Sequence, residues 1–280
     1  MKDTLLTKKQ KAVIESALSK QDYKRVIDVL DTISTKHSGT AKMKDKRYVI
    51  AEIVRHMTEA DHKDPIREFY KAGLKILSIK SYNAKEAGIH ILWRGYKHNK
   101  ANVTKWLYKI TDDANWEVRE YAAGALVQTL SSNPEFYSIL KKWVKDKSEN
   151  IRRGVVMSAI ALRDGTDRAK IQKAFALMEP LLYDSSVYVK KNLGPFILGS
   201  YFGNHLPEDV FRFLDRMIKL KDVHVRWNIA MAFNNSFGNR YPNEALKYLR
   251  ILAKDDSKVV QRAVKSALNH LKKRNKSIEL

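Results

Sequence analysis

The chain has 280 residues, of which 44% are hydrophobic, which is enough to form a sizeable core. It contains no cysteine, which excludes disulfides, thiolate metal sites and cysteine nucleophiles. Its 53 basic and 31 acidic residues give a formal net charge of +22, which favours a polyanionic partner; solubility alone, or a basic proteome, is the alternative explanation.

Apolar residues at three- and four-residue spacing predict two helices near the start, over residues 5–18 and 23–33. After a turn at residues 38–40, Pro65 is expected at the first position of a helix that Asp64 caps, because its missing N–H costs nothing there. Alternating helices follow, and Pro134, Pro207 and Pro242 each open one. The predicted helices after the turn are 44–58, 65–77, 83–96, 102–110, 116–130, 134–144, 150–162, 168–182, 186–201, 207–220, 223–234, 242–253 and 258–272.

Five segments repeat one pattern: a short polar turn, a branched apolar residue, a basic residue and an Ala-rich helix. The branched residues are Val118, Ile151, Val189, Val225 and Val260. Their steps are 33, 38, 36 and 35 residues, and a weaker copy at residues 82–92 lies 34 residues before the first. A period near 35 predicts stacked helix pairs, each too small to bury its apolar face alone.

The sequence therefore predicts an all-α protein, a solenoid of HEAT-like helical repeats with a basic concave groove. We expect a single repeat domain over residues 1–280, with N-terminal helices in 1–80, regular pairs in 81–275 and a tail in 276–280. The self-repelling charge predicts a monomer.

No membrane partner, metal or cofactor is expected. The longest apolar stretch, residues 154–162, is too short to cross a bilayer, and charged helix rather than a signal core follows Met1. We therefore expect a cytoplasmic protein, associated with the nucleoid if the source is prokaryotic. The eight histidines form no cluster at metal spacing, and no phosphate loop or catalytic triad spacing is present.

Two neighbouring positions of the repeat carry the charge. The position two after the branched residue is occupied by Glu86, Glu120, Arg153, Lys191, Trp227 and Arg262. The position before it is occupied by Lys85, Arg119, Arg152, Lys190, Arg226 and Gln261. Five of these last six are basic, which predicts phosphate contacts along a nucleic-acid backbone. The alternative is the Asp/Arg pair that often bonds across adjacent turns of HEAT repeats, but that alternative leaves the doubled basic residues at 152–153 and 190–191 unexplained.

Trp116 and Glu120 are four residues apart, which places the indole and the carboxylate on one face of a helix. An aromatic ring beside a carboxylate suits a cation, because the ring presents its negative quadrupole and the acid its charge. The alternative is that Trp116 packs at the start of the helix and Glu120 is a solvated acid.

The pattern Trp116-x-x-x-Glu120, with Arg153 in the equivalent place of the following repeat, resembles the HEAT-repeat alkylpurine DNA glycosylases of the AlkD and AlkC type. Residues 65–74 are similar to an early helix of that family, and the similarity spans roughly residues 60–235. The resemblance implies that Trp116 and Glu120 flank the lesion nucleotide and that Arg153 binds a nearby phosphate. The family's second aromatic residue is absent, since Pro195 fills its place; Trp227, one repeat later, is our candidate substitute.

The resemblance implies hydrolysis of the N-glycosidic bond of N3- or N7-alkylated purines in double-stranded DNA. Glu120 and Trp116 are the expected catalytic residues. The expected DNA-binding residues are Arg153, Arg152, Arg119, Lys190, Lys191, Arg226 and Trp227. Two alternatives stay open: a non-catalytic HEAT module that binds DNA or RNA, and a scaffold for an acidic protein partner. A salt titration separates these two, because only nucleic-acid binding weakens steeply with salt.

Overall fold

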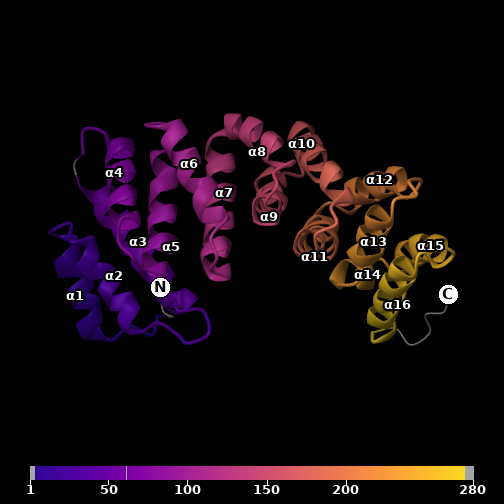
Figure 1. Cartoon of the computed structure of the whole chain (residues 1–280), viewed down its shortest axis with the longest axis horizontal. Helices are drawn as coiled ribbons and strands as arrows, with labels where there is room; N and C mark the ends of the chain where they lie inside the picture. Colours follow the sequence, from indigo (N-terminus) through magenta and orange to yellow (C-terminus); the bar gives the residue numbers. More distant parts are fainter. Residues whose placement is uncertain (1–3, 61, 275–280) are drawn as a thin grey trace. The chain divides into compact units, whose positions relative to one another are not determined.

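Every regular element in the described part of the chain is a helix, which confirms the all-α prediction (Figure 1). The computed structural model describes residues 4–60 and 62–274. The chain divides into two compact units, Met1–Asn133 and Pro134–Leu280, and the expected single domain stays a prediction.

The first unit contains helices that pair in the order in which they follow one another. They are α1 (Lys8–Leu18), α2 (Tyr23–Thr32), α3 (Met43–Glu59), α4 (Pro65–Leu77), α5 (Tyr82–Leu92), the 3-10 turn η1 (Trp93–Gly95), α6 (Lys100–Thr111) and α7 (Trp116–Ser132). Helix α4 packs against α5, α6 packs against α7, and α5 also packs against α7 (Figure 1). The predicted helix over 83–96 is shorter in the structure, because α5 ends at Leu92 and the 3-10 turn η1 follows it.

The second unit continues the alternation of helix pairs. Its elements are η2 (Pro134–Phe136), α8 (Tyr137–Trp143), α9 (Glu149–Ser158), η3 (Ala159–Leu162), α10 (Arg168–Met178), η4 (Glu179–Tyr183), α11 (Val187–Lys191), η5 (Asn192–Gly203), α12 (Pro207–Met217), α13 (Val223–Ala232), α14 (Ser236–Arg240), α15 (Pro242–Ala253) and α16 (Lys258–Lys272). Each helix pair buries its apolar face against the next, as the repeat period predicts.

Polar caps and prolines begin the helices where the sequence predicts. The Asp64 carboxylate accepts a hydrogen bond from the Arg67 backbone N–H at 3.0 Å, and Pro65 occupies the first turn of α4. Pro134, Pro207 and Pro242 are the first residues of their elements.

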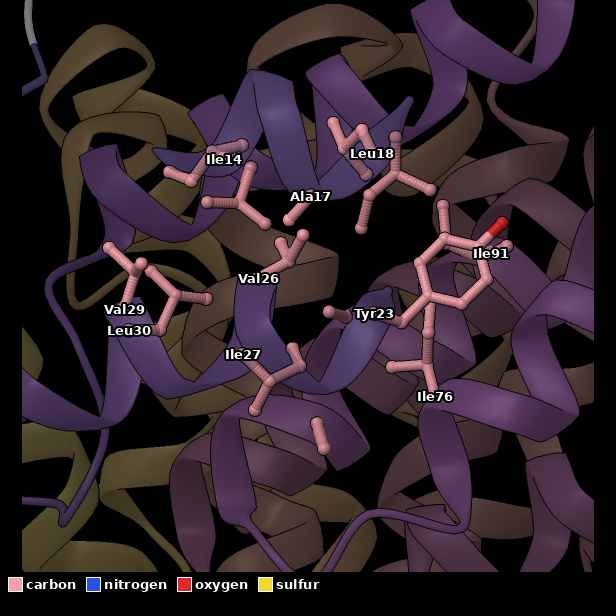
Figure 2. Close-up of a cluster of buried hydrophobic side chains, with 14 of the residues drawn as sticks. Ile14, Ala17, Leu18, Tyr23, Val26, Ile27, Val29, Leu30, Ile76 and Ile91 are labelled. Atoms are coloured by element: carbon pink, nitrogen blue, oxygen red, sulfur yellow. The ribbon is translucent and has the colours of Figure 1, made fainter. Parts of the chain in front are cut away.

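The core of the first unit begins with α1 and α2, whose apolar side chains meet α4 and α5 (Figure 2). Ile27 and Leu30 of α2 are fully buried, as are Ile76 of α4 and Ile91 of α5. Burying an aliphatic side chain of this size contributes about 1.5–3 kcal/mol. The first helices are thus an integral part of this unit.

The predicted helix over 186–201 differs from the observed one, because Pro195 lies inside it. The chain leaves the α-helix after Lys191 and continues as a π-helix, η5. Proline cannot donate the helical hydrogen bond, and its ring clashes with the carbonyl four residues earlier, so the wider turn accommodates it. The Pro195 carbonyl accepts a hydrogen bond from Asn235 Nδ2 at 2.8 Å.

Gly199 brings this π-helix into contact with α13. A Cβ atom at Gly199 would lie 2.3 Å from the Ala232 carbonyl oxygen, a backbone atom that cannot move aside cheaply. Gly199→Ala should therefore lower the free energy of unfolding by about 1–3 kcal/mol, measured by urea denaturation. Gly165→Ala is the control, since its Cβ would meet only Leu206 Cδ2 at 3.4 Å. Equal stability of the two variants would contradict this account of the close approach.

Candidate functional site

A cavity of about 730 Å³ lies between α3, α5 and α7 of the first unit. Helix α3 contributes a stripe with an apolar centre formed by Ile50, Ala51 and Val54. Helix α7 contributes Glu120 and Gly124, so one of the two predicted catalytic residues lines this cavity. Cavities of this volume accommodate small ligands or one part of a larger ligand.

Trp116 is the first residue of α7 and lies one helical turn before Glu120. Its side chain is 45% exposed, and the His37 imidazole contacts it edge-on with ring centroids 5.7 Å apart. The helix begins here because the Asn115 side chain accepts a hydrogen bond from the Glu117 backbone N–H at 2.9 Å. An indole with this exposure retains surface on which a ligand can stack.

A buried lysine of α3 forms an ion pair with the first turn of α7. The Lys46 side chain is 1% exposed, and its Nζ lies 2.7 Å from Glu86 Oε2 of α5 and 2.7 Å from Glu117 Oε1 of α7. Lys46 Nζ also donates a hydrogen bond to Thr40 Oγ1 at 3.1 Å and lies 4.5 Å from the centre of the Tyr121 ring. We call these residues the Lys46 cluster. It joins α3, α5, α7 and the segment before α3.

Lys46 was not among the site residues predicted from the sequence. The signal was present, because Lys46 precedes Val49 by three residues and Ile53 by seven, and both valine and isoleucine are fully buried. A lysine at a core-facing position of an amphipathic helix needs anionic partners. Glu86 appeared in the repeat column, but only the structure pairs it with Lys46.

Burial and neighbouring groups shift the pKa values of the two glutamates of the Lys46 cluster in opposite directions. Burial raises the pKa of Glu86 to about 7, although Lys46 opposes this rise. Burial alone would also raise the pKa of Glu117, but hydrogen bonds from Lys46, Ser38 and Thr40 lower it below its usual value. Glu117 therefore carries the permanent negative charge beside Lys46.

The Glu86 carboxyl should make stability depend on pH. Its pKa is about 7 in the folded chain and 4.5 as its ordinary value, so between these pH values the folded state binds more protons than the unfolded state. The free energy of unfolding then falls as pH rises through this window, on the order of 2 kcal/mol from this group. Glu86→Gln should flatten that part of the profile in urea denaturation between pH 4.5 and 8. A variant that keeps the slope of the wild type would rule out Glu86 as its source.

His90, which lines the cavity, is uncharged near neutral pH. Burial lowers the pKa of His90 to about 4, and the neighbouring Arg94 charge lowers it further. The His90 ring meets the Tyr121 ring edge-on, with centroids 5.3 Å apart. A cationic ligand in the cavity is therefore not repelled by a charged His90.

Several predicted DNA-binding residues hold partners within the protein. Arg152 makes a bidentate contact with Asp184, with Nε–Oδ2 at 2.5 Å and Nη2–Oδ1 at 3.1 Å. Arg226 pairs with Asp255 and donates to the Leu220 carbonyl at 2.8 Å. These contacts match the Asp/Arg pairing that the sequence left open as an alternative.

The same column in the first unit is engaged in a similar way. Arg119 Nη1 donates to the carbonyls of Asp113 and Ala114 at 2.8 and 2.9 Å, and Lys85 Nζ lies 2.5 Å from Asp113 Oδ2. This column therefore ties the start of each second helix to the turns beside it.

In the second unit, basic side chains from both columns lie beside aromatic rings. Arg153 is 4% exposed, donates to Asn192 Oδ1 at 3.2 Å and lies 5.4 Å from the Tyr188 ring centre. Lys190 is buried and lies 5.1 Å from the ring centre of the half-buried Trp227, whereas Lys191 is exposed. Trp116, Glu120 and Arg119 lie in the first unit, and the other predicted site residues lie in the second.

Two further observations concern the described residues as a whole. No helix in residues 4–60 and 62–274 is both long and apolar enough to cross a membrane. Within the same ranges, no group of three or more His, Asp or Glu side chains has an arrangement that could hold a metal ion.

Comparisons with known proteins give one family. The model of a family described as "DNA alkylation repair enzyme" matches residues 41–232, a range that includes α3 to α7 and the columns of the second unit. No curated protein matches the chain.

Two solved structures are similar to the chain. One is the designed armadillo repeat protein YIII(Dq.V1)4CPAF in complex with peptide (KR)4, which has 19% identity and a TM-score of 0.31 over 79% of this chain and 99% of its own. The other is the X-ray structure of YIBA_ECOLI, which has 18% identity and a TM-score of 0.40 over 97% of this chain and 88% of its own.

Proposed function

The chain belongs to the DNA alkylation repair enzyme family, and from this premise we propose that it hydrolyses the N-glycosidic bond of N3- or N7-alkylated purines in double-stranded DNA. Membership of this family supports a role in DNA repair. The glycosylase assignment rests on one observation above all. Glu120 presents a carboxylate to the cavity between α3, α5 and α7, one turn after the exposed indole of Trp116.

The chemistry requires few catalytic groups. An N3- or N7-alkylated purine carries a positive charge, so it leaves as a neutral base when the electron pair of the C1′–N bond moves onto the ring. The sugar becomes an oxocarbenium-like cation, which one carboxylate can stabilise. We assign this role to Glu120, which also orients the water that adds to C1′ and accepts its proton.

Trp116 is assigned to contact with the deoxyribose of the lesion nucleotide. Its exposed ring offers the negative quadrupole of its face to the developing positive charge. The Lys46 cluster supports this arrangement, because Glu117 lies between Trp116 and Glu120 and is held by Lys46 Nζ at 2.7 Å. This ion pair joins the first turn of α7 to α3.

The DNA-binding assignments differ in what supports them. The exposed Lys191 is suited to a phosphate contact, and Arg153 is assigned to a phosphate through the family resemblance. Trp227 is assigned to the place of the aromatic residue that Pro195 replaces. The internal partners of Arg119, Arg152, Arg226 and Lys190 favour a role in tying the repeats together, and contact of these residues with DNA stays a prediction.

We further propose a monomer that acts in the compartment of the DNA, in the cytoplasm or nucleoid if the source is prokaryotic. The reaction needs no cofactor, since water is the only co-reactant. Incubation of the protein with methylated duplex, followed by detection of free base, tests the proposal. Binding to the duplex without any release of base would instead favour the non-catalytic nucleic-acid-binding alternative.

A further inference from the structure

Three arginines line the cavity that Glu120 also lines, and they differ in how they are engaged. They are Arg47, Arg55 and Arg94. Arg55 is neutralised by carboxylates of α1 and α3. Its Nη2 lies 2.9 Å from a Glu15 oxygen and 2.8 Å from a Glu52 oxygen, and its Nη1 lies 2.7 Å from a Glu59 oxygen. It therefore contributes little net charge to a ligand.

Arg94 is directed toward the protein. Its Nη1 donates to the His90 backbone carbonyl, and its guanidinium lies 4.6 Å from the Trp93 ring centre and 5.9 Å from the Phe69 ring centre. Burial lowers the pKa of Arg94 from its ordinary value. This guanidinium is thus held by a carbonyl and by aromatic faces.

Arg47 is different. Its side chain is exposed, and no hydrogen bond, ion pair or ring contact joins it to the residues that the structure describes. Arg47 lines the cavity together with His90 and Tyr121, and its charge is one of the causes that lower the pKa of His90. An arginine with an unoccupied planar fork matches phosphate in geometry and charge.

The position of Arg47 on α3 sets it opposite α7. It lies one turn before the apolar centre of the α3 stripe, three residues before Ile50 and four before Ala51. Glu120 contributes to the cavity from the α7 wall. Helix α3 therefore offers a cation to the cavity and α7 an anion, and the neutral His90 of α5 also lines it.

We infer that Arg47 is a further phosphate-binding residue, which holds a phosphodiester of the damaged DNA strand at the α3 wall of this cavity. The inference rests on the proposed function, because the alkylated nucleotide carries an anionic phosphate and a positive charge that moves from the base to the sugar as the C1′–N bond breaks. The phosphate complements Arg47, and the cationic part complements Glu120. Arg47 is a positioning residue and takes no part in bond cleavage.

The test measures binding of an undamaged fluorescein-labelled duplex by anisotropy over a series of salt concentrations. Arg47→Met should weaken binding about 10-fold at a fixed salt concentration and reduce the slope of log K against log salt by about 1. Arg47→Lys keeps the charge and should restore the slope, with incomplete recovery of affinity. The urea unfolding midpoint should not change, because Arg47 has no partner among the described residues.

Arg25→Met is the matched control, since Arg25 is an exposed arginine of α2 that does not line the cavity. Equal affinity and equal slope for Arg47→Met and Arg25→Met would overturn the assignment of Arg47. In single-turnover excision, Arg47→Met should raise the half-saturating enzyme concentration about 10-fold and leave the maximal rate intact. A wild type that releases no base would refute the glycosylase proposal, while the binding comparison would still decide on Arg47.

Discussion

Glu120→Gln should abolish the release of 7-methylguanine and 3-methyladenine and leave duplex binding nearly intact. The amide preserves the size of the side chain, but it carries no negative charge to stabilise the sugar cation and cannot accept a proton from water. Loss of one such electrostatic group costs about 10²- to 10³-fold in rate. The measurement is single-turnover release of free base from a methylated duplex, with binding followed by anisotropy.

Glu244→Gln is the control for this variant. It makes the same chemical change at an exposed position of α15, outside the cavity, and should excise at the rate of the wild type. A selective loss in Glu120→Gln identifies the carboxylate of α7 as the catalytic group. Release by Glu120→Gln at the wild-type rate would eliminate the assignment.

Of the single substitutions proposed here, Lys46→Met should lower the free energy of unfolding most. The substitution leaves the buried Glu86 and the partly buried Glu117 without their cation, which lies 2.7 Å from each in the wild type. Removing one partner of a buried ion pair costs about 3–5 kcal/mol, because the remaining charge loses its compensation. Urea denaturation at pH 8 measures this loss under conditions in which both carboxyl groups favour the charged form.

Two comparisons test the physical cause. Lys24→Met removes an exposed lysine paired with Asp28 on α2, and it should change stability by less than about 1 kcal/mol. The triple variant Lys46→Met, Glu86→Gln, Glu117→Gln removes the charges together and should be more stable than Lys46→Met alone. If the triple variant is less stable than the single one, charge compensation is not the cause of the loss.

The repeat pattern was sufficient to predict the helical architecture. The five branched residues that define the period, Val118, Ile151, Val189, Val225 and Val260, are all fully buried. Such a residue recurs because each helix pair needs an apolar contact with the next, and this need is local in the sequence. The repeat period therefore predicts the fold class without any knowledge of distant contacts.

Short helices and departures from α-helical geometry were harder to predict from the sequence. Hydrophobic spacing did not predict α14, a short helix that begins where the Asn235 side chain accepts a hydrogen bond from the Phe237 backbone N–H. Nor did it predict the π-helix around Pro195, whose carbonyl is held by Asn235 from another element. The first feature depends on a local side-chain cap and the second on a contact between distant parts of the chain, and hydrophobic spacing encodes neither.

The candidate site was predicted in part. Glu120 and Trp116 were singled out as neighbours on one helix. In the structure Glu120 lines the cavity, whereas Trp116 is exposed and is not among the residues that line it. The Lys46 cluster and Arg47 were missed, because their meaning depends on which residues of α5 and α7 lie opposite α3. A single amphipathic pattern indicates that a residue faces inward, but it does not name the partner across the helix interface.

The most direct measurement is the release of free alkylated purine from a methylated duplex, followed by mass spectrometry with wild-type protein in excess over DNA. We predict that the wild type releases 7-methylguanine or 3-methyladenine and leaves an abasic strand in equal amount. Tight, salt-dependent binding to the same duplex with no free base above the protein-free background would contradict the account.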